Sequence, residues 1–307
     1  MKLEKILYLL AIFLCSLPFI SPPVALLIGI ILALTVSNPF QVTVAKATHI
    51  LLQASVVGLG FGMNIMQAVS AGKEGLWFTV LSIFSTLTFG FFLGKNLKVD
   101  KHTSFLISSG TAICGGSAIA AVSPIIRSDE KQISTALGTI FILNSVALFL
   151  FPWIGSFLHL TQHQFGVWAA IAIHDTSSVA GAASRYGKEA LQTALTIKLE
   201  RALWIIPLGI AASFIFSGRS QKIVIPYFIL LFVGAMLLNT FIPSIHPISK
   251  SIVFISAIGL KITLFLIGTR LNKELISNVG FRPLIQGIAL WLFISVMSLT
   301  IVTYLVK

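Results

Sequence analysis

The segment Gly110-Thr111-Ala112-Ile113-Cys114-Gly115-Gly116-Ser117-Ala118-Ile119-Ala120-Ala121 decides how this chain is expected to fold. It lies within a long apolar stretch, yet it combines adjacent glycines with two hydroxyl side chains. Each glycine costs a helix interior roughly 1 kcal/mol relative to alanine. We therefore expect the helix to break here and to expose backbone N–H groups at the positive end of a half-helix, where an anion binds. The alternative is that the small residues only let helices pack closely.

The composition around this segment predicts a membrane protein. Of the 307 residues, 56% are apolar and only 10% are charged, whereas soluble domains carry roughly 25% charged residues. Apolar runs of about 20 residues, the length that crosses a bilayer as a helix, recur along the whole chain. We expect an all-α polytopic protein with about eleven spans, at 6–20, 22–37, 48–68, 76–94, 104–126, 131–157, 165–184, 189–217, 222–240, 250–270 and 283–306.

The net charge of +12 predicts membrane orientation rather than nucleic-acid binding, because no basic stretch is interleaved with aromatic residues. If the eleven spans alternate, one side receives eleven basic residues: Lys2, Lys5, Lys46, Lys95, Lys98, Lys101, Arg219, Lys222, Arg270, Lys273 and Arg282. The other side receives seven: Lys73, Arg127, Lys131, Arg185, Lys188, Lys250 and Lys307. This bias predicts a bacterial inner-membrane protein with a cytoplasmic N-terminus and a periplasmic C-terminus.

The number of spans also predicts an internal repeat. With residues 1–21 set aside as an extra N-terminal helix, 22–160 and 161–307 hold five spans each. An odd number of spans inverts the second repeat relative to the first. Inverted repeats build secondary transporters, whose substrate sites lie mid-membrane where helices break.

A second polar cluster, His174-Asp175-Thr176-Ser177-Ser178, lies about ten residues into an apolar span. Unsatisfied polar groups cost several kcal/mol each against lipid, so these side chains must face protein or water. If the segment is helical, His174 and Ser178 share a face with Asp175 beside it. We expect His174 or Asp175 to carry a proton and the cluster to line a cavity. The alternative is a structural role, in which the cluster forms hydrogen bonds to neighbouring helices.

Charged residues also lie within the span at 189–217. Lys198 and Arg201 are three residues apart and share a helix face, whereas Glu200 points away from Lys198. Their counter-charge could be Asp175, a bound anion, or the two in exchange. Asn144, in another apolar span, is equally suited to contact a substrate or to bond a neighbouring helix.

The remaining patterns predict no enzyme, no cofactor and no metal site. There is no phosphate-binding glycine loop or nucleophile elbow. His159 and His163 lack a third ligand, and two cysteines, Cys15 and Cys114, define no disulfide framework. The sequence leaves the oligomeric state open, and a homodimer is a possible state because homodimers are the commonest oligomers.

Four motifs together resemble a known family. These motifs are Cys114-Gly115-Gly116-Ser117-Ala118-Ile119-Ala120-Ala121, Asn144 with the later Phe151-Pro152, His174-Asp175-Thr176-Ser177, and Lys198-Leu199-x-Arg201. They resemble the YeiH-type family of bacterial membrane proteins, labelled sulfate exporters. The resemblance implies an inner-membrane anion carrier, related to bile-acid symporter and sodium–proton antiporter folds, with crossed broken helices. Glu200 departs from the uncharged polar residue that the family pattern leads us to expect, which leaves the local charge balance open.

We therefore expect a secondary transporter that exports a small oxyanion, sulfate or a related sulfur-containing anion, and is coupled to protons or sodium. The alternative is a cation/proton antiporter that uses Asp175 and Glu200. An intramembrane enzyme or a receptor is disfavoured. The residues expected to bind substrate are Cys114, Gly115, Gly116, Ser117, Asn144, Thr176, Ser177, Lys198 and Arg201. Proton coupling is assigned to His174 and Asp175.

Overall fold

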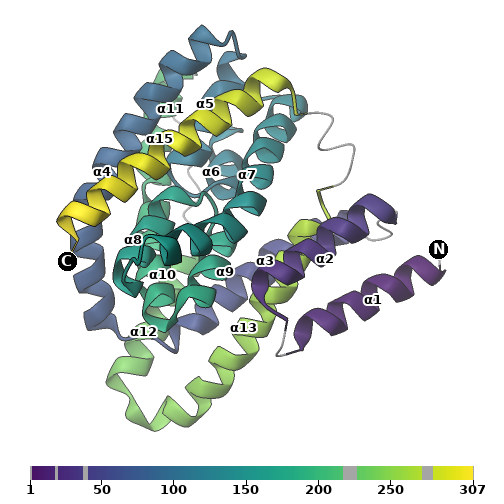
Figure 1. Cartoon of the computed structure of the whole chain (residues 1–307), viewed down its shortest axis with the longest axis vertical. Helices are drawn as coiled ribbons and strands as arrows, with labels where there is room; N and C mark the ends of the chain where they lie inside the picture. The colour runs from purple at the N-terminus through teal and green to yellow at the C-terminus, as the bar shows by residue number, and fades with distance from the viewer. Residues whose placement is uncertain (1, 18–19, 37–40, 217–226, 272–278, 307) are drawn as a thin grey trace. The chain divides into compact units, whose positions relative to one another are not determined.

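A computed structural model describes residues 2–17, 20–36, 41–216, 227–271 and 279–306, and all of its regular elements in these ranges are helices (Figure 1). The chain forms two compact units, Met1–Ser70 with Pro226–Lys273 and Ala71–Ile225 with Glu274–Lys307. Each unit draws residues from both predicted repeats, whose boundaries stay a prediction. Four of the basic residues counted above, Arg219, Lys222, Lys273 and Lys307, lie outside the described residues.

The first unit contains α1 (Lys2–Ser16), α2 (Pro22–Thr35), α3 (Gln41–Gly60), α12 (Tyr227–Phe241), the 3₁₀ turn η1 (Pro243–Ile245) and α13 (His246–Gly268). Helix α13 packs against α2 and α3. The approach to α2 is so close that a Cβ on Gly29 would collide with the Phe265 carbonyl oxygen. Lys261, a basic residue within α13, donates to the Leu17 carbonyl at 2.6 Å, which satisfies its ammonium inside this unit.

The second unit holds every residue expected to form the site. Helix α4 (Ile65–Asn96) continues into this unit, which then contains α5 (Lys101–Ala112), α6 (Gly116–Val122), α7 (Glu130–Phe157), α8 (Gln162–Ala172), α9 (Thr176–Tyr186), α10 (Lys188–Leu203), α11 (Ile205–Phe216) and α15 (Phe281–Leu305). Helix α15 packs beside α4, where Phe89 and Phe293 lie 4.6 Å apart, and beside α5 (Figure 1).

Helices α5 and α6 form a hairpin that enters and leaves at the same end of the second unit. Helix α5 has 12 residues, about 18 Å, which is little more than half of a bilayer core. Beyond the break the chain turns back, because a Cβ on Gly110 of α5 would lie 3.2 Å from Ile119 of α6. The base of the hairpin is closed by Gln132, at the start of α7, which donates to Asp100 at 2.9 Å.

Helices α8 and α9 form a second hairpin. The Glu189 amide, at the start of α10, donates to the Gln162 side chain, at the start of α8, at 3.1 Å. The Tyr186 hydroxyl, at the end of α9, donates to the Leu160 carbonyl at 2.6 Å. The base of this hairpin is therefore also closed, with α8 leading in and α9 leading out.

The two hairpins enter from opposite ends of the unit. Helix α7 runs for 28 residues between the two hairpin bases, which corresponds to about 42 Å. Helix α15 runs between the same ends: its first turn lies beside Asp100 and Asp129, and the Val306 carbonyl just beyond its last turn accepts from Gln164 at 2.8 Å. Both tips therefore lie between the two ends.

This arrangement corrects the eleven-span interpretation. The segments at 104–126 and 165–184 do not cross but turn back as re-entrant hairpins, because two half-helices joined by a polar tip have the length and hydropathy of one span. The correction places Arg127 and Lys131 at the same end as Lys98, and reverses their assignment from strict alternation. Of the basic residues that the structure describes at the two ends of this unit, six then lie at the first end, Lys95, Lys98, Lys101, Arg127, Lys131 and Arg282, against Lys73, Arg185 and Lys188 at the other.

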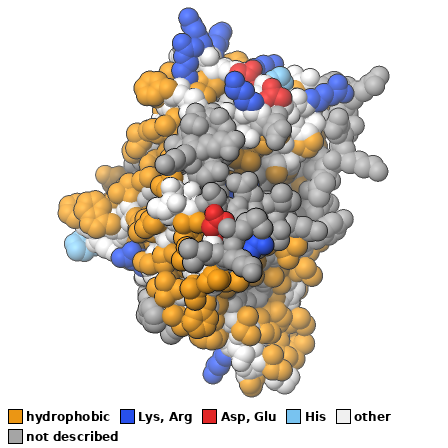
Figure 2. All heavy atoms as spheres, turned by 90° about the vertical axis from the view of Figure 1, so that its right-hand side faces the viewer, with side chains coloured by type: hydrophobic (Ala, Val, Ile, Leu, Met, Phe, Trp, Pro, Cys, Tyr) orange, Lys and Arg blue, Asp and Glu red, His pale blue; other side chains and the backbone are white. Residues whose placement is uncertain are grey.

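The helices and their surfaces suit a bilayer. Five helices of the described residues are long and apolar enough to cross a membrane: Trp77–Asn96, Lys131–Phe157, Lys188–Phe216, Pro243–Gly268 and Phe281–Tyr304. Figure 2 shows that hydrophobic side chains cover much of the described surface on the face drawn, with few charged side chains among them. Large apolar side chains are widely exposed, among them Trp77, Phe214 and Phe281 at 76%, 76% and 77%. Surfaces of this kind are typical of lipid contact.

Candidate functional site

The tip of the first hairpin is the predicted helix break. Helix α5 ends at Ala112, residues 113–115 are not helical, and α6 begins at Gly116. Gly115 adopts φ 63° and ψ −123°, a conformation that a residue with a Cβ reaches only under strain. Gly115 is also the N-cap of α6 and has no side chain with which to cap this helix, while the Cys114 sulfur accepts from the Ala118 amide in its first turn. Gly116 is half-buried and Ser117 is exposed, so the N-terminus of α6 is open in the sense that no carboxylate of the described residues caps it.

The tip of the second hairpin closes on itself. Helix α8 ends at Ala172, and α9 begins at Thr176 with Asp175 as its N-cap. The carboxylate accepts from the Ser178 amide at 2.7 Å and from the hydroxyls of Ser177 and Ser178. The segment 174–178 is therefore not one continuous helix, so the shared helix face considered for His174 and Ser178 was wrong. A capping aspartate follows an interruption of the helix because its side chain bonds the first free amides.

Asn144 of α7 joins this tip to the rest of the unit. Its Nδ2 donates to the Asp175 carboxylate, and its Oδ1 accepts from the His174 amide at 3.1 Å. One buried side chain therefore fixes both a backbone group of the interruption and the carboxylate that caps α9.

Lys198 and Arg201 of α10 contact the C-terminal ends of the two half-helices that lead into the tips, α8 and α5. Lys198 Nζ donates to the carbonyls of Ala170 and Ile173 at 3.2 and 2.7 Å. Arg201 donates to the Ala112 carbonyl and to the Ser82 hydroxyl, the latter at 2.6 Å. Both side chains are fully buried. The two cations thus meet the negative C-terminal ends of α8 and α5, where helix dipoles favour positive charge.

The two tips touch. A Cβ on Gly115 would lie 3.2 Å from the Asp175 Cβ and 3.3 Å from Ile140 of α7. The open N-terminus of α6 and the carboxylate that caps α9 therefore share one small region, to which Cys114, 2% exposed, also belongs.

His174 is a buried polar side chain whose hydrogen-bonding groups are unsatisfied among the described residues. It is fully buried, and neither ring nitrogen has a hydrogen-bond partner within the described part of the chain. Its position in the interruption between α8 and α9 brings it near Lys198 and Arg201, whose charges both act on it.

All the residues expected to form the site therefore lie at or beside the two tips or on the helices that hold them. Thr176 is buried in the first turn of α9. The sequence reasoning missed Ser82 and the carbonyls of Ala112, Ala170 and Ile173. A serine in an apolar helix is a weak signal, and no sequence pattern marks a carbonyl as a ligand.

Comparison with known proteins places this chain among membrane proteins. A family described as "Conserved hypothetical protein 698" matches residues 3–287. The "UPF0324 membrane protein" of Bacteroides thetaiotaomicron is 53% identical over 93% of this chain and 87% of its own length. Relatives from Porphyromonas gingivalis and Photobacterium profundum are each 50% identical, over 92% and 97% of this chain and 87% and 91% of their own lengths. No solved structure matches.

Proposed function

Since this chain belongs to the UPF0324 family of membrane proteins, we propose that it is a secondary transporter of a small oxyanion, sulfate or a related sulfur-containing anion, in the bacterial inner membrane. The observation that carries this proposal is the open N-terminus of α6 at the tip of a re-entrant hairpin. Backbone amides at a helix N-terminus bind anions, and broken helices place such amides at the substrate sites of transporters.

Asp175 supplies the coupling in this proposal. A carboxylate beside the α6 N-terminus repels an anion as long as it is ionised, so the anion binds when Asp175 carries a proton. Anion and proton then occupy the tip region together. His174 is the second candidate for proton exchange, because its ring nitrogens have no partner among the described residues.

Lys198 and Arg201 act on the passenger through their charge rather than through direct contact. The hydrogen bonds described for them go to helix carbonyls and to Ser82. Their two positive charges offset the carboxylate and the C-terminal ends of the half-helices, which keeps the tip region from becoming strongly negative.

The end that bears Lys98 and Arg127 is the cytoplasmic one, because cytoplasmic loops collect Lys and Arg. Helix α15 runs from this end to the opposite end, which makes its C-terminus periplasmic. Single cysteines introduced at Lys98, Arg127 and Arg185 test the assignment, since Cys15 and Cys114 are buried. A membrane-impermeant maleimide is expected to label Arg185→Cys from outside and the other two only in inverted vesicles. Labelling of Arg127→Cys from outside would restore the eleven-span topology.

A cation/proton antiporter is the second candidate, and Asp175 favours it. The carboxylate accepts from Asn144, Ser177 and Ser178 where the tips meet, and a carboxylate in such a place binds a cation or a proton equally well. The direction of the measured flux distinguishes export from import, and its dependence on a pH or a sodium gradient identifies the coupling ion.

The deciding experiment is flux into proteoliposomes with labelled sulfate, sulfite and taurine under imposed pH or sodium gradients. Asp175→Asn keeps an N-cap, because asparagine caps as well as aspartate, but removes the titratable charge. We expect anion flux in the wild type that loses its dependence on the gradient in Asp175→Asn. Asp100→Asn, the same change at the N-cap of α5, is the matched control and is expected to retain coupling. Robust cation exchange without anion flux under any gradient would replace the proposal by the antiporter.

A further inference from the structure

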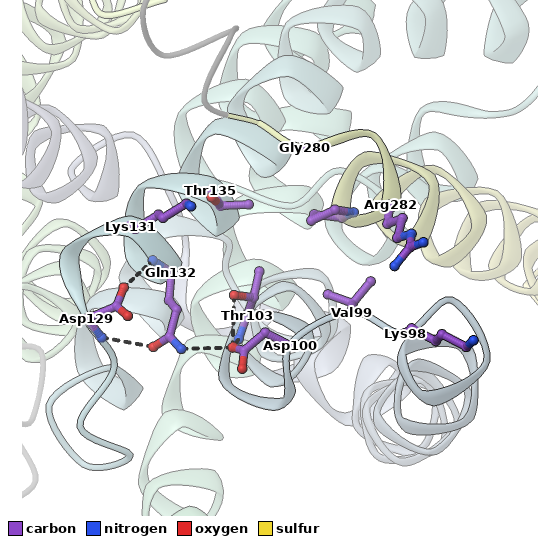
Figure 3. Close-up of a pocket in the computed structure, with 11 residues that line it drawn as sticks. Lys98, Val99, Asp100, Thr103, Asp129, Lys131, Gln132, Thr135, Gly280 and Arg282 are labelled. Carbon is purple, nitrogen blue, oxygen red and sulfur yellow. Dashed lines mark hydrogen bonds between the residues drawn. The ribbon is translucent and has the colours of Figure 1, made fainter.

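A cavity of about 360 Å³, lined mostly by polar and charged residues, lies at the first end of the second unit, away from the two tips. It is lined by the turn after α4, the first turns of α5 and α7, and the start of α15 (Figure 3). Its volume falls within the range of roughly 300–1,000 Å³ typical of small-ligand sites. The transport proposal makes no use of this cavity.

Three basic side chains line the cavity: Lys98, Lys131 and Arg282. All three are exposed, and within the described ranges none has a hydrogen bond or ion pair with an acidic side chain. In Figure 3 Lys131 lies on one side of the cavity, and Arg282 and Lys98 lie on the other. The arrangement suits a ligand that is received between them.

The two aspartates of the cavity are committed to helix capping and hairpin closure. Asp100 accepts from the amides of His102 and Thr103 at 3.1 and 3.0 Å, and from Gln132 at 2.9 Å. Asp129 accepts from the Gln132 amide at 2.8 Å in a capping box. The cations are therefore left to a ligand, and the lining carries a net positive charge.

The N-terminus of α15 also lies at the cavity. Gly280 is its N-cap and provides no side-chain hydrogen bond, in contrast to the aspartates that cap α5 and α7. The N-terminal end of this 25-residue helix adds to the attraction for an anion. Three cations with an open helix N-terminus form the donor set that suits a phosphate group.

Lys98 ends α4 with φ 53°, a left-handed conformation that glycine adopts more readily than lysine. Arg127 and His159 have the same conformation, with φ 53° and 52°, so it belongs to the way these helical segments end. At Lys98 this conformation makes glycine a replacement that removes the cation and still suits the backbone.

We propose that this cavity binds the phosphate group of an anionic phospholipid at the membrane surface. Basic pockets at helix ends on the cytoplasmic side receive such headgroups. Phe281, which is 77% exposed, precedes Arg282 and offers an apolar side chain that the acyl chains of such a lipid could contact. The same phosphate chemistry could come from a soluble ion, so the experiment separates the two sources.

The test measures the thermal unfolding temperature of the full chain in a neutral detergent, titrated with short-chain phosphatidylglycerol, short-chain phosphatidylcholine or inorganic phosphate. We expect stabilisation by phosphatidylglycerol and little by the other two. Lys131→Gln and Arg282→Gln are expected to weaken the apparent affinity roughly fivefold each. Arg185→Gln, at the opposite end of the unit, is the matched control and is expected to change nothing.

Lys98→Gly separates binding from folding. It removes the cation and the backbone strain together, so the protein without lipid is expected to be as stable as the wild type or more so, while the response to phosphatidylglycerol falls. Equal responses of all variants, or equal stabilisation by phosphatidylcholine, would overturn the site. If inorganic phosphate stabilised the protein as much as phosphatidylglycerol does, and this effect were also lost in the Lys98, Lys131 and Arg282 variants, the phospholipid would be ruled out as the ligand. The ligand would then be a soluble phosphate. Transport is not measured, so the outcome is independent of the proposed function.

Discussion

The two hairpin tips are built alike but end differently. Each consists of a half-helix, a short interruption and a second half-helix, and each receives a cation from α10 at its C-terminal end. At the second tip, Asp175 caps the following helix with its own carboxylate. At the first tip, Gly115 takes the capping position and brings no side chain. One tip therefore supplies its own anionic cap, and the other supplies none.

This difference teaches that charge alone does not identify a ligand site. The buried cations look most like anion ligands in the sequence, yet their hydrogen bonds stabilise helix ends. The group suited to meet an anion is an uncharged backbone segment.

Arg201→Met is expected to have the largest effect because it removes the cation from the end of α5. Hydrogen bonds to a charged group contribute about 1.5–3 kcal/mol each, and the guanidinium makes two. We expect the free energy of unfolding to fall by about 3 kcal/mol or more, measured by thermal or denaturant unfolding in detergent. Arg201→Lys, which keeps the charge, should recover part of the loss, and unfolding of Arg201→Met at the wild-type midpoint would contradict the capping role.

Gly115→Ala breaks the open tip itself. A methyl group there would require a strained backbone and would meet Asp175 and Ile140 at 3.2 and 3.3 Å. We expect a loss of about 2 kcal/mol in stability, together with loss of flux. The adjacent Gly116→Ala is the matched control, because its methyl would meet the nearest atom, on Leu137, at an ordinary 3.5 Å. Equal effects of the two changes would show that the Gly115 conformation is not required.

Asn144→Ala disconnects the second tip from α7. It leaves the His174 amide without its acceptor and removes one donor from Asp175, which should cost about 1–2 kcal/mol. Because the proposed coupling carboxylate loses a hydrogen bond from Asn144, the pH dependence of flux should change. Ser145→Ala serves as control, since that hydroxyl donates within its own helix, to the Phe141 carbonyl at 2.8 Å. An unchanged pH profile would separate Asn144 from the coupling group.

The smallest effect is expected at Asp100, the capping aspartate at a hairpin base rather than at a tip. Burial alone would raise the pKa of this carboxyl, but hydrogen bonds from Thr103 and His102 and the charge of His102 together lower the pKa below its usual value. Its contribution to stability is therefore present above the unfolded pKa of about 3.9 and is lost as the pH falls through the lower folded pKa. Unfolding measured at pH 6 and pH 3 should show a weaker pH dependence in Asp100→Asn, whereas Asp100→Ala should lose about 0.5–1 kcal/mol at pH 6. An Asp100→Asn protein with an unaltered acid response would assign that response to other carboxyls.

The sequence by itself determined the class of the protein, the break near Gly115 and the residues that gather at the tips. Apolar content and the rarity of charge allow only a membrane-embedded helical chain, and glycines or a capping aspartate inside an apolar segment are costly unless the helix ends there. Tertiary structure alone decided that two apparent spans turn back, that Arg127 joins Lys98 at one end, and that Lys198 and Arg201 bond carbonyls. Hydropathy measures the length of an apolar run but not the direction of the chain within it, so it does not reveal that a run turns back. Every residue has the same backbone carbonyl, so the sequence does not identify which carbonyl a buried cation contacts.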